Sequence, residues 1–192
     1  ASRGLGDVYK RQNQQLLYDA LYHSVSATIN ELTEDAKHLG AKVGYICILH
    51  TWGSEMNYHP HIHVILLGGG LTAKNQWRDK GEEFFLPVKV LSKLFRGKYL
   101  HELKTLWKDN KLQFFGSSEK YRNHYTFKEL LNICYTKNWI PHCKKTFNGA
   151  QSVIKYLGKY THRIAISNHR IIRMDDNTVT YHVKAVSYTH LR

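Results

Sequence analysis

Two short apolar stretches joined by a polar connection constrain the fold more than any other feature of the sequence. Residues 42–50 (KVGYICILH) and 60–67 (PHIHVILL) are rich in β-branched and aromatic residues, which favour buried strands. The segment between them, TWGSEMNYH, has the polarity and the length of a hairpin connection. The sequence therefore predicts an antiparallel hairpin.

Histidines alternate along the second of these strands. Successive side chains of a strand point to opposite faces, so His59, His61 and His63 share one face, while Ile62 and Val64 lie on the other. Imidazole is the commonest neutral metal ligand near pH 7, and two imidazoles on one strand face can share a cation. The pattern predicts a metal site, although ordinary histidines on a half-exposed strand would give the same alternation.

A third ligand could come from the first strand. If the hairpin is symmetric about Glu55 and Met56, His50 lies opposite His61, with Cβ atoms about 5 Å apart. Both rings could then meet one ion. This register favours His50 as the partner of the strand histidines.

Periodic patterns place helices around this hairpin. Apolar stripes predict helices over residues 14–38, 88–108 and 148–160, and residues 126–136 resemble another short helix. The glycine run at 68–70 is predicted to end the second strand, residues 138–143 to form a short strand, and residues 169–184 a second hairpin. Together these elements predict an α+β fold in which helices pack on a central antiparallel sheet.

Two tyrosines lie one turn apart in the last predicted helix. Tyr156 and Tyr160 are neighbours on one helix face, and a tyrosine can attack phosphorus to give a phosphotyrosine ester. Spacing alone does not separate this role from packing, because two other pairs have the same spacing, Tyr18/Tyr22 and Tyr121/Tyr125.

The charge balance indicates a polyanionic partner. Lysine and arginine number 28 against 15 acidic residues, which gives a net charge of +13 at pH 7. Such a balance suggests nucleic acid, although a solvated basic surface remains the alternative. No apolar run approaches the roughly 18 residues that cross a bilayer. Three cysteines without C-x-x-C spacing indicate neither a disulfide framework nor a thiolate zinc site, so we expect a reducing cytoplasm.

The two ends differ from the rest of the chain. Residues 1–12 and 187–192 carry no periodic pattern and resemble translated sequencing-adapter sequence. We therefore expect non-native ends there, and one native domain over residues 13–186 that is an internal fragment of a longer protein.

Three blocks of sequence resemble a known family. The run LHTWGSEMNYHPHIHVILLGGGL is similar to the HUH-motif core of the two-tyrosine rolling-circle transposases of the insertion sequence 91 family. The runs FFLPVKVLSKLFRGKYLHEL and YLGKYTHRIAISNHRI resemble two further blocks of that family, in the same order. The resemblance implies an HUH endonuclease-like fold, in which the central sheet carries the histidine motif.

The resemblance also implies roles for individual residues. His61 and His63 would be the HUH metal ligands, and Tyr156 and Tyr160 the nucleophiles. HUH enzymes vary the third ligand, for which the hairpin geometry favours His50, with His59 and Glu55 as alternatives. Arg163 and Arg170, which follow the tyrosine helix, are candidate phosphate contacts, and surface arginines are the other interpretation.

The predicted activity is that of a DNA strand transferase. A divalent cation, Mg²⁺ or Mn²⁺ by family analogy, would assist cleavage and rejoining of single-stranded transposon ends through a 5′-phosphotyrosine link. No nucleotide cofactor or membrane is required, and we expect the enzyme to act on bacterial DNA in the cytoplasm. The sequence leaves open which tyrosine attacks first, the DNA sequence recognised and the oligomeric state.

Two other functions fit parts of the sequence. A basic domain could hold single-stranded nucleic acid by charge and stacking without any chemistry. A zinc hydrolase could use the histidines and water without the tyrosines.

Overall fold

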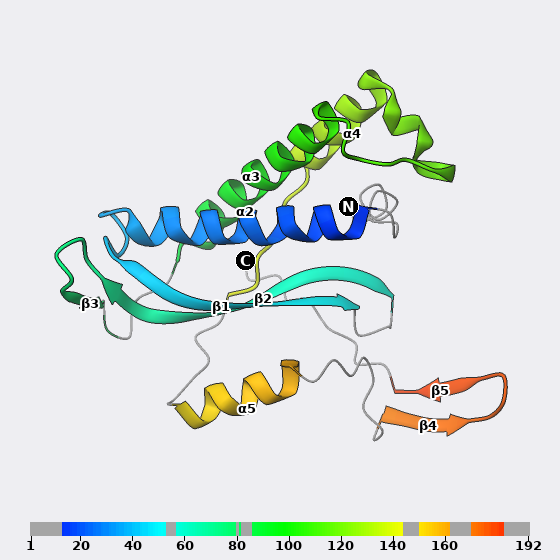
Figure 1. The fold of residues 1–192 in the computed structure, drawn as a ribbon. Helices are drawn as coiled ribbons and strands as arrows, with labels where there is room; N and C mark the ends of the chain where they lie inside the picture. Colours follow the sequence, from blue (N-terminus) through cyan, green and yellow to red (C-terminus); the bar gives the residue numbers. More distant parts are fainter. Residues whose placement is uncertain are drawn as a thin grey trace. The chain divides into compact units, whose positions relative to one another are not determined.

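The computed structural model describes residues 13–52, 57–79, 81, 86–143, 150–161 and 170–182. Its helices and strands are, in order, α2 (Gln14–Glu34), β1 (Lys42–Trp52), β2 (Tyr58–Leu71), β3 (Trp77–Asp79), α3 (Val88–Lys108), the 3₁₀ helix η3 (Gly116–Arg122), α4 (His124–Thr136), α5 (Ala150–Thr161), β4 (Ile171–Met174) and β5 (Val179–Tyr181) (Figure 1). The predicted non-native ends and the tip of the first hairpin, residues 53–56, lie outside the described residues.

The predicted fold class is confirmed. Strands β1, β2 and β3 form one sheet in that order, in which β2 and β3 pair antiparallel and the arrows of β1 and β2 run in opposite directions (Figure 1). Strands β4 and β5 form a separate antiparallel hairpin. The chain divides into two compact units, one of residues 1–47 and 64–145 and the other of residues 48–63 and 146–192.

The core of the first unit joins α2 to the sheet and to α3. Ile29 of α2 clusters with the buried Leu39, Ala41 and Val43, and apolar side chains of both strands pack against this cluster. Helix α3 packs on α2 and buries the side chains of three residues that are at most 1% exposed, namely Tyr99, Leu100 and Leu103. Part of the apolar stripe of α3 is therefore buried in the core of this unit.

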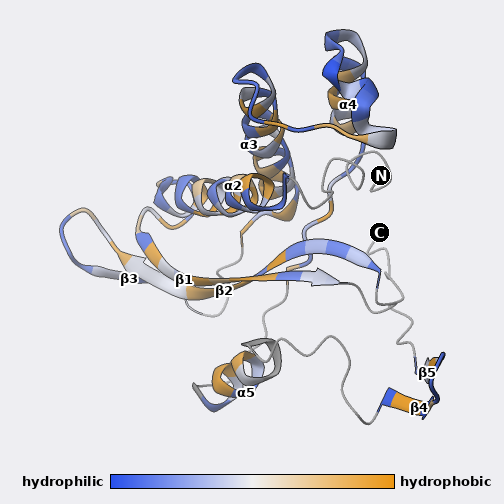
Figure 2. Cartoon of the chain, turned by 45° about the vertical axis from the view of Figure 1, so that its right-hand side comes forward, coloured by the Kyte–Doolittle hydropathy of each residue, from blue (hydrophilic) through white to orange (hydrophobic). Residues whose placement is uncertain are grey.

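The first hairpin changes character along its length. Strand β2 is hydrophilic over its first residues and hydrophobic further along (Figure 2). In the hydrophobic part, Val64 and Leu66 pack against the cluster that includes Ile29. By strand alternation, odd-numbered residues of β2 fall on the opposite face. That face is the one that carries His61 and His63.

The prediction that the glycine run ends β2 is wrong. The strand continues to Leu71, and Gly69 and Gly70 pair with Asp79 and Arg78 of β3. A Cβ on Gly70 would collide with the backbone carbonyl of Lys42, so the missing side chain lets the neighbouring strand approach closely. The glycines therefore allow close pairing and do not terminate the strand.

The prediction of a strand at 138–143 is also wrong. The segment is irregular, and its Trp139 packs against α3. The Trp139 ring lies 5.5 Å from the ring of Phe95 and 5.9 Å from that of Tyr99, measured between centroids. The Trp139 indole also donates a hydrogen bond to the carbonyl of Cys134 at 3.1 Å, which holds the segment against the end of α4.

The C-terminal hairpin is held at its turn by an aspartate. The Asp175 carboxylate accepts hydrogen bonds from the backbone N–H groups of Asn177 and Thr178 and from the Thr178 hydroxyl. The hydroxyl hydrogen bond, followed by the two from the backbone, lowers the pKa of the Asp175 carboxyl. The turn chemistry therefore explains why the predicted second hairpin forms.

No described helix combines the length and the apolar character needed to cross a membrane.

Candidate metal and tyrosine site

Three histidines of the second unit form a compact group. His50 comes from β1, and His61 and His63 come from β2. One ring nitrogen from each lies within 4.8 Å of those of the other two, and all three side chains are half-buried. The structure therefore brings together the three histidines that the sequence analysis selected as candidate ligands.

The strand register expected from a symmetric hairpin does not give the observed neighbour of His50. The Nε2 atoms of His61 and His63 lie 3.1 Å apart. The ring centroid of His50 lies 4.5 Å from that of His63 and 5.5 Å from that of His61. His50 is thus nearer to His63 than to the residue expected opposite it.

Two contacts orient these rings. The Nδ1 of His61 donates a hydrogen bond to the backbone carbonyl of His59 at 2.7 Å, so the neutral ring presents the lone pair of Nε2. Metal-binding histidines commonly make such a bond through their second nitrogen. The His50 ring stacks on Trp52, with centroids 5.6 Å apart and an interplanar angle of 9°.

The alternatives for the third ligand have different positions. The side chain of His59 is exposed and is not a member of the three-histidine group, although its carbonyl holds His61. Glu55 lies outside the described residues. His50 is therefore the alternative that the geometry favours.

The surroundings keep two of the rings neutral. Burial, followed by the charges of His50 and His61, lowers the pKa of His63 to about 4. Burial also lowers the pKa of His61, against the opposing effect of the hydrogen bond to the His59 carbonyl. Neutral imidazole is the form that binds metal, so no proton needs to be displaced from either ring at pH 7.

The donor set fits a divalent cation. Two nitrogens bound to one ion at about 2.1 Å lie about 3.0–3.4 Å apart for bond angles between 90° and 109°. The 3.1 Å between Nε2 of His61 and Nε2 of His63 falls in this range. Imidazole nitrogens suit transition metals better than Mg²⁺, which prefers oxygen ligands. The group could therefore hold a cation, and its donor chemistry favours a transition metal.

A tyrosine from a distant part of the sequence contacts this group. The phenol oxygen of Tyr156, in α5, lies 3.1 Å from Nδ1 of His63, and the two residues are 93 positions apart in sequence. Their rings meet edge-on, with centroids 6.5 Å apart. The structure thus places Tyr156 directly beside the histidine group, within the same compact unit.

The structure describes the remaining candidate residues to different extents. The backbone of Tyr160 lies in α5, one turn beyond Tyr156, but its side chain is outside the described part of the chain, as is all of Arg163. Arg170 precedes β4, donates from Nε to the carbonyl of His182 at 2.9 Å, and lies over the ring of Tyr181. Arg170 therefore braces the C-terminal hairpin, and its contact with phosphate stays a prediction.

Sequence reasoning missed two supporting groups, the Trp52 ring and the His59 carbonyl. Trp52 is two residues from His50 and therefore lies on the same strand face. This spacing could have predicted its contact with the His50 ring. The carbonyl bond to His61 had no sequence signal, because any residue at position 59 would supply it.

Together, the fold and the site define an α+β protein with a histidine triad that resembles an HUH motif. Comparison with known families agrees with this class. Residues 44–190 match the family model Y2_Tnp, described as "Putative transposase", and the chain belongs to this transposase family. The resemblance to insertion sequence 91 transposases is thereby confirmed.

Two curated relatives support the assignment. The chain is 37% identical over 180 residues to "Putative transposase y4qJ" of Sinorhizobium fredii, covering 93% of this chain and 45% of that protein. It is 26% identical over 156 residues to "Transposase for insertion sequence element IS801" of Pseudomonas savastanoi pv. phaseolicola, covering 81% of this chain and 36% of that protein. The chain thus spans less than half the length of these relatives. No solved structure matches it significantly.

Proposed function

We propose that this chain carries the catalytic site of a rolling-circle DNA transposase, which cleaves and rejoins single-stranded DNA through a phosphotyrosine intermediate. The observation that carries the proposal is the 3.1 Å contact between the Tyr156 phenol oxygen and Nδ1 of His63. Membership of the transposase family and the net charge of +13 support a DNA substrate.

The three histidines would hold the cation. His50, His61 and His63 would bind it through ring nitrogens that already lie within 4.8 Å of one another. When bound, a divalent cation would draw charge from the non-bridging oxygens of the scissile phosphate and so favour attack at phosphorus. Of the two ions expected from family analogy, the nitrogen donors favour Mn²⁺ over Mg²⁺.

His63 links the cation site to the nucleophile through its proton. Only one hydrogen can lie between the two Nε2 atoms that are 3.1 Å apart. Because His61 presents a lone pair there, His63 donates from Nε2, and its Nδ1 accepts the phenol hydrogen of Tyr156. If a cation were held by His61 and His63 through Nε2, a neutral His63 would carry its hydrogen on Nδ1. His63 would then donate to the phenol oxygen of Tyr156 and stabilise its phenolate form.

The chemical step follows from this arrangement. The Tyr156 oxygen bonds to phosphorus while the bond from phosphorus to the 3′ oxygen breaks. The phenol proton passes to water and the departing 3′ oxygen takes one from water, so the products are a 5′-phosphotyrosine ester and a free 3′-hydroxyl. The ester conserves the phosphodiester bond energy, and rejoining needs no ATP. Tyr160 would serve a second strand, and Arg163 and Arg170 would contact phosphates.

Covalent capture tests the proposal. Incubation of the full chain with single-stranded DNA and Mn²⁺ should give a species of reduced mobility on a denaturing gel, and EDTA should prevent it. Tyr156→Phe should reduce this species strongly. Tyr125→Phe is the matched control, because Tyr125 is 79% exposed on α4 and belongs to a pair with the same spacing.

The rival functions predict different results. A pure binding domain would retain DNA on a native gel and give no covalent species under any condition. A zinc hydrolase would cleave DNA with Zn²⁺ and would keep its activity in a Tyr156→Phe/Tyr160→Phe variant. Either outcome would contradict the proposed phosphotyrosine chemistry.

A further inference from the structure

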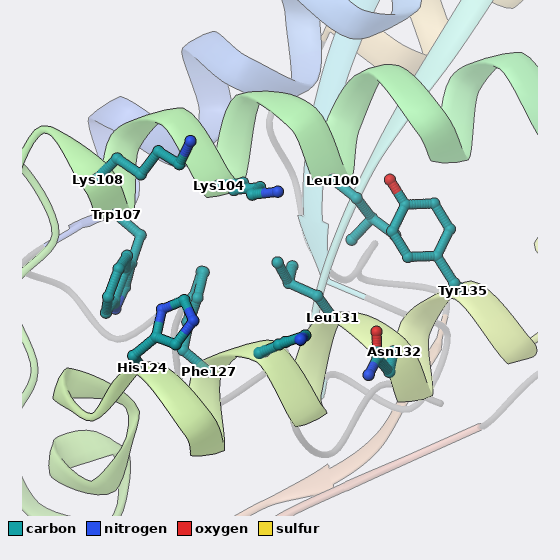
Figure 3. A pocket seen from close by; sticks show the side chains of 10 residues that line it. Leu100, Lys104, Trp107, Lys108, His124, Phe127, Leu131, Asn132 and Tyr135 are labelled. Carbon is teal, nitrogen blue, oxygen red and sulfur yellow. The ribbon is translucent and has the colours of Figure 1, made fainter.

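A cavity lies between α3 and α4 in the first unit, on residues that the proposed chemistry does not use. Its volume is about 310 Å³, at the lower end of the range for small-molecule sites. Leu100 of α3 and Phe127 and Leu131 of α4 line it with buried apolar side chains (Figure 3). A cavity of this size suits one or two rings and excludes a folded partner.

Aromatic rings form one wall of this cavity. Trp107 stacks on Phe127, with centroids 5.0 Å apart and an interplanar angle of 12°, and the His124 ring lies 5.6 Å from that of Trp107. The Trp107 indole donates a hydrogen bond to the carbonyl of Tyr121 at 2.8 Å, which fixes its orientation. Tyr135 lines the opposite end and is 46% exposed (Figure 3). Trp107 is half-buried and His124 is exposed, so these two rings are the part of the wall that a flat ring can reach.

Three lysines also line the cavity. Lys104 and Lys108 lie one turn apart on α3 (Figure 3). Lys128 lies on α4, and all three side chains are exposed. No carboxylate lines the cavity, and within the described ranges none of the three forms an ion pair. Like charges one turn apart slightly destabilise a helix. The helix dipole stabilises a positive charge at Lys108, in the last turn of α3, but does not stabilise one at Lys104 or Lys128. The stability of the helices therefore does not explain why lysines stand at these two positions.

We propose that this cavity binds one unpaired nucleotide of the DNA substrate, with the base on the aromatic wall and its flanking phosphates at the lysines. The inference rests on the proposed function and adds a second DNA contact to it. Every base has a face that can stack on an aromatic side chain, and lysines neutralise the phosphates on either side. A base inside a duplex is already stacked and paired, so it would have to be extruded before it could enter. Single-stranded DNA is therefore the expected ligand.

Binding measurements with matched lysine variants test the site. We would measure fluorescence anisotropy of a labelled oligothymidylate with the full chain in EDTA, so that binding is recorded without cleavage. The test variant is Lys104→Ala/Lys108→Ala. The control, Lys89→Ala/Lys93→Ala, removes two exposed lysines with the same spacing from the same helix. Loss of two phosphate contacts should lower the slope of log K against log salt by about 1.4 in the test variant. The control should leave the slope unchanged, and equal effects of the two variants would overturn the site.

Loss of aromatic contact should weaken binding separately. His124 is exposed at the first residue of α4, so His124→Ala should leave the fold intact. Stacking of one base is worth about 5- to 150-fold in affinity, and His124 forms one part of the wall, so we expect a loss near the lower end of this range. An unchanged affinity would contradict base stacking. Duplex DNA that bound as tightly, with the same dependence on Lys104 and Lys108, would overturn the assignment to single strands.

Photocrosslinking locates the base directly. An oligonucleotide that contains 5-bromodeoxyuridine should crosslink to a peptide bearing Trp107, His124 or Tyr135, and crosslinks confined to other peptides would overturn the proposal. The two proposals fail separately. If the covalent species forms but pocket variants bind normally, the cavity assignment alone is wrong. If binding depends on the pocket but no covalent species forms, the proposed chemistry alone is wrong.

Discussion

Replacement of His63 by alanine should nearly abolish specific binding of Mn²⁺. The Nε2 atoms of His61 and His63 lie 3.1 Å apart, and alanine at position 63 leaves only His61 and His50 in the three-histidine group. Mutation of a residue that hydrogen-bonds to a metal ligand typically lowers the affinity for the metal by about 10- to 100-fold. Loss of a direct ligand should lower the affinity more than loss of such a neighbour. We therefore expect His63→Ala to bind Mn²⁺ at least about 100-fold more weakly, which corresponds to about 2.7 kcal/mol of binding free energy.

His59→Ala is the matched control for this prediction. His59 lies two residues from His61 on the same strand, with ring centroids 5.2 Å apart, but its side chain is exposed and outside the group. Alanine keeps the backbone carbonyl that orients His61. Binding of Mn²⁺ can be followed by titration calorimetry and by the electron paramagnetic resonance signal of the free ion. The reasoning is refuted if His63→Ala binds like the parent chain, or if His59→Ala loses as much affinity.

Three further predictions concern the cation, the sheet and the core. Mn²⁺ should support formation of the covalent species at lower concentration than Mg²⁺, and Zn²⁺ should compete with it, as titration of each ion would show. Gly70→Ala should destabilise the chain by about 1–3 kcal/mol in urea unfolding, because its Cβ would meet the Lys42 carbonyl, whereas Gly68→Ala has open space and should change stability little. Leu103→Ala, at a side chain with 0% exposure, should cost about 2–5 kcal/mol in the same assay, and a loss below 1 kcal/mol would contradict its central place in the core.

Long periodic segments were the most predictable part of the fold. The helix expected over 88–108 has those bounds in the structure, where it packs on α2 and buries part of its apolar stripe. The helix expected over 14–38 ends at Glu34, and the next residues form a turn. Strand β3 is only three residues long (WRD) and has no apolar alternation, so its pairing with Gly69 and Gly70 left no local signal.

The candidate site was predictable only in part, for a physical reason. Strand alternation places His61 and His63 on one face, and this follows from local geometry alone. The nearness of His50 to His63 depends on strand register, and the contact between Tyr156 and His63 joins residues 93 positions apart. No spacing rule distinguishes Tyr156 from tyrosines of equal periodicity. Family resemblance selected it, and the tertiary structure supplies the contact.

Peptide mapping of the covalent protein–DNA species tests the central claim most directly. After incubation with single-stranded DNA and Mn²⁺, digestion and mass spectrometry should find the nucleotide adduct on Tyr156, and His63→Ala should abolish it. An adduct only on residues outside α5, or an adduct on Tyr156 that forms equally well without His63, would contradict a site built from the histidine group and this tyrosine.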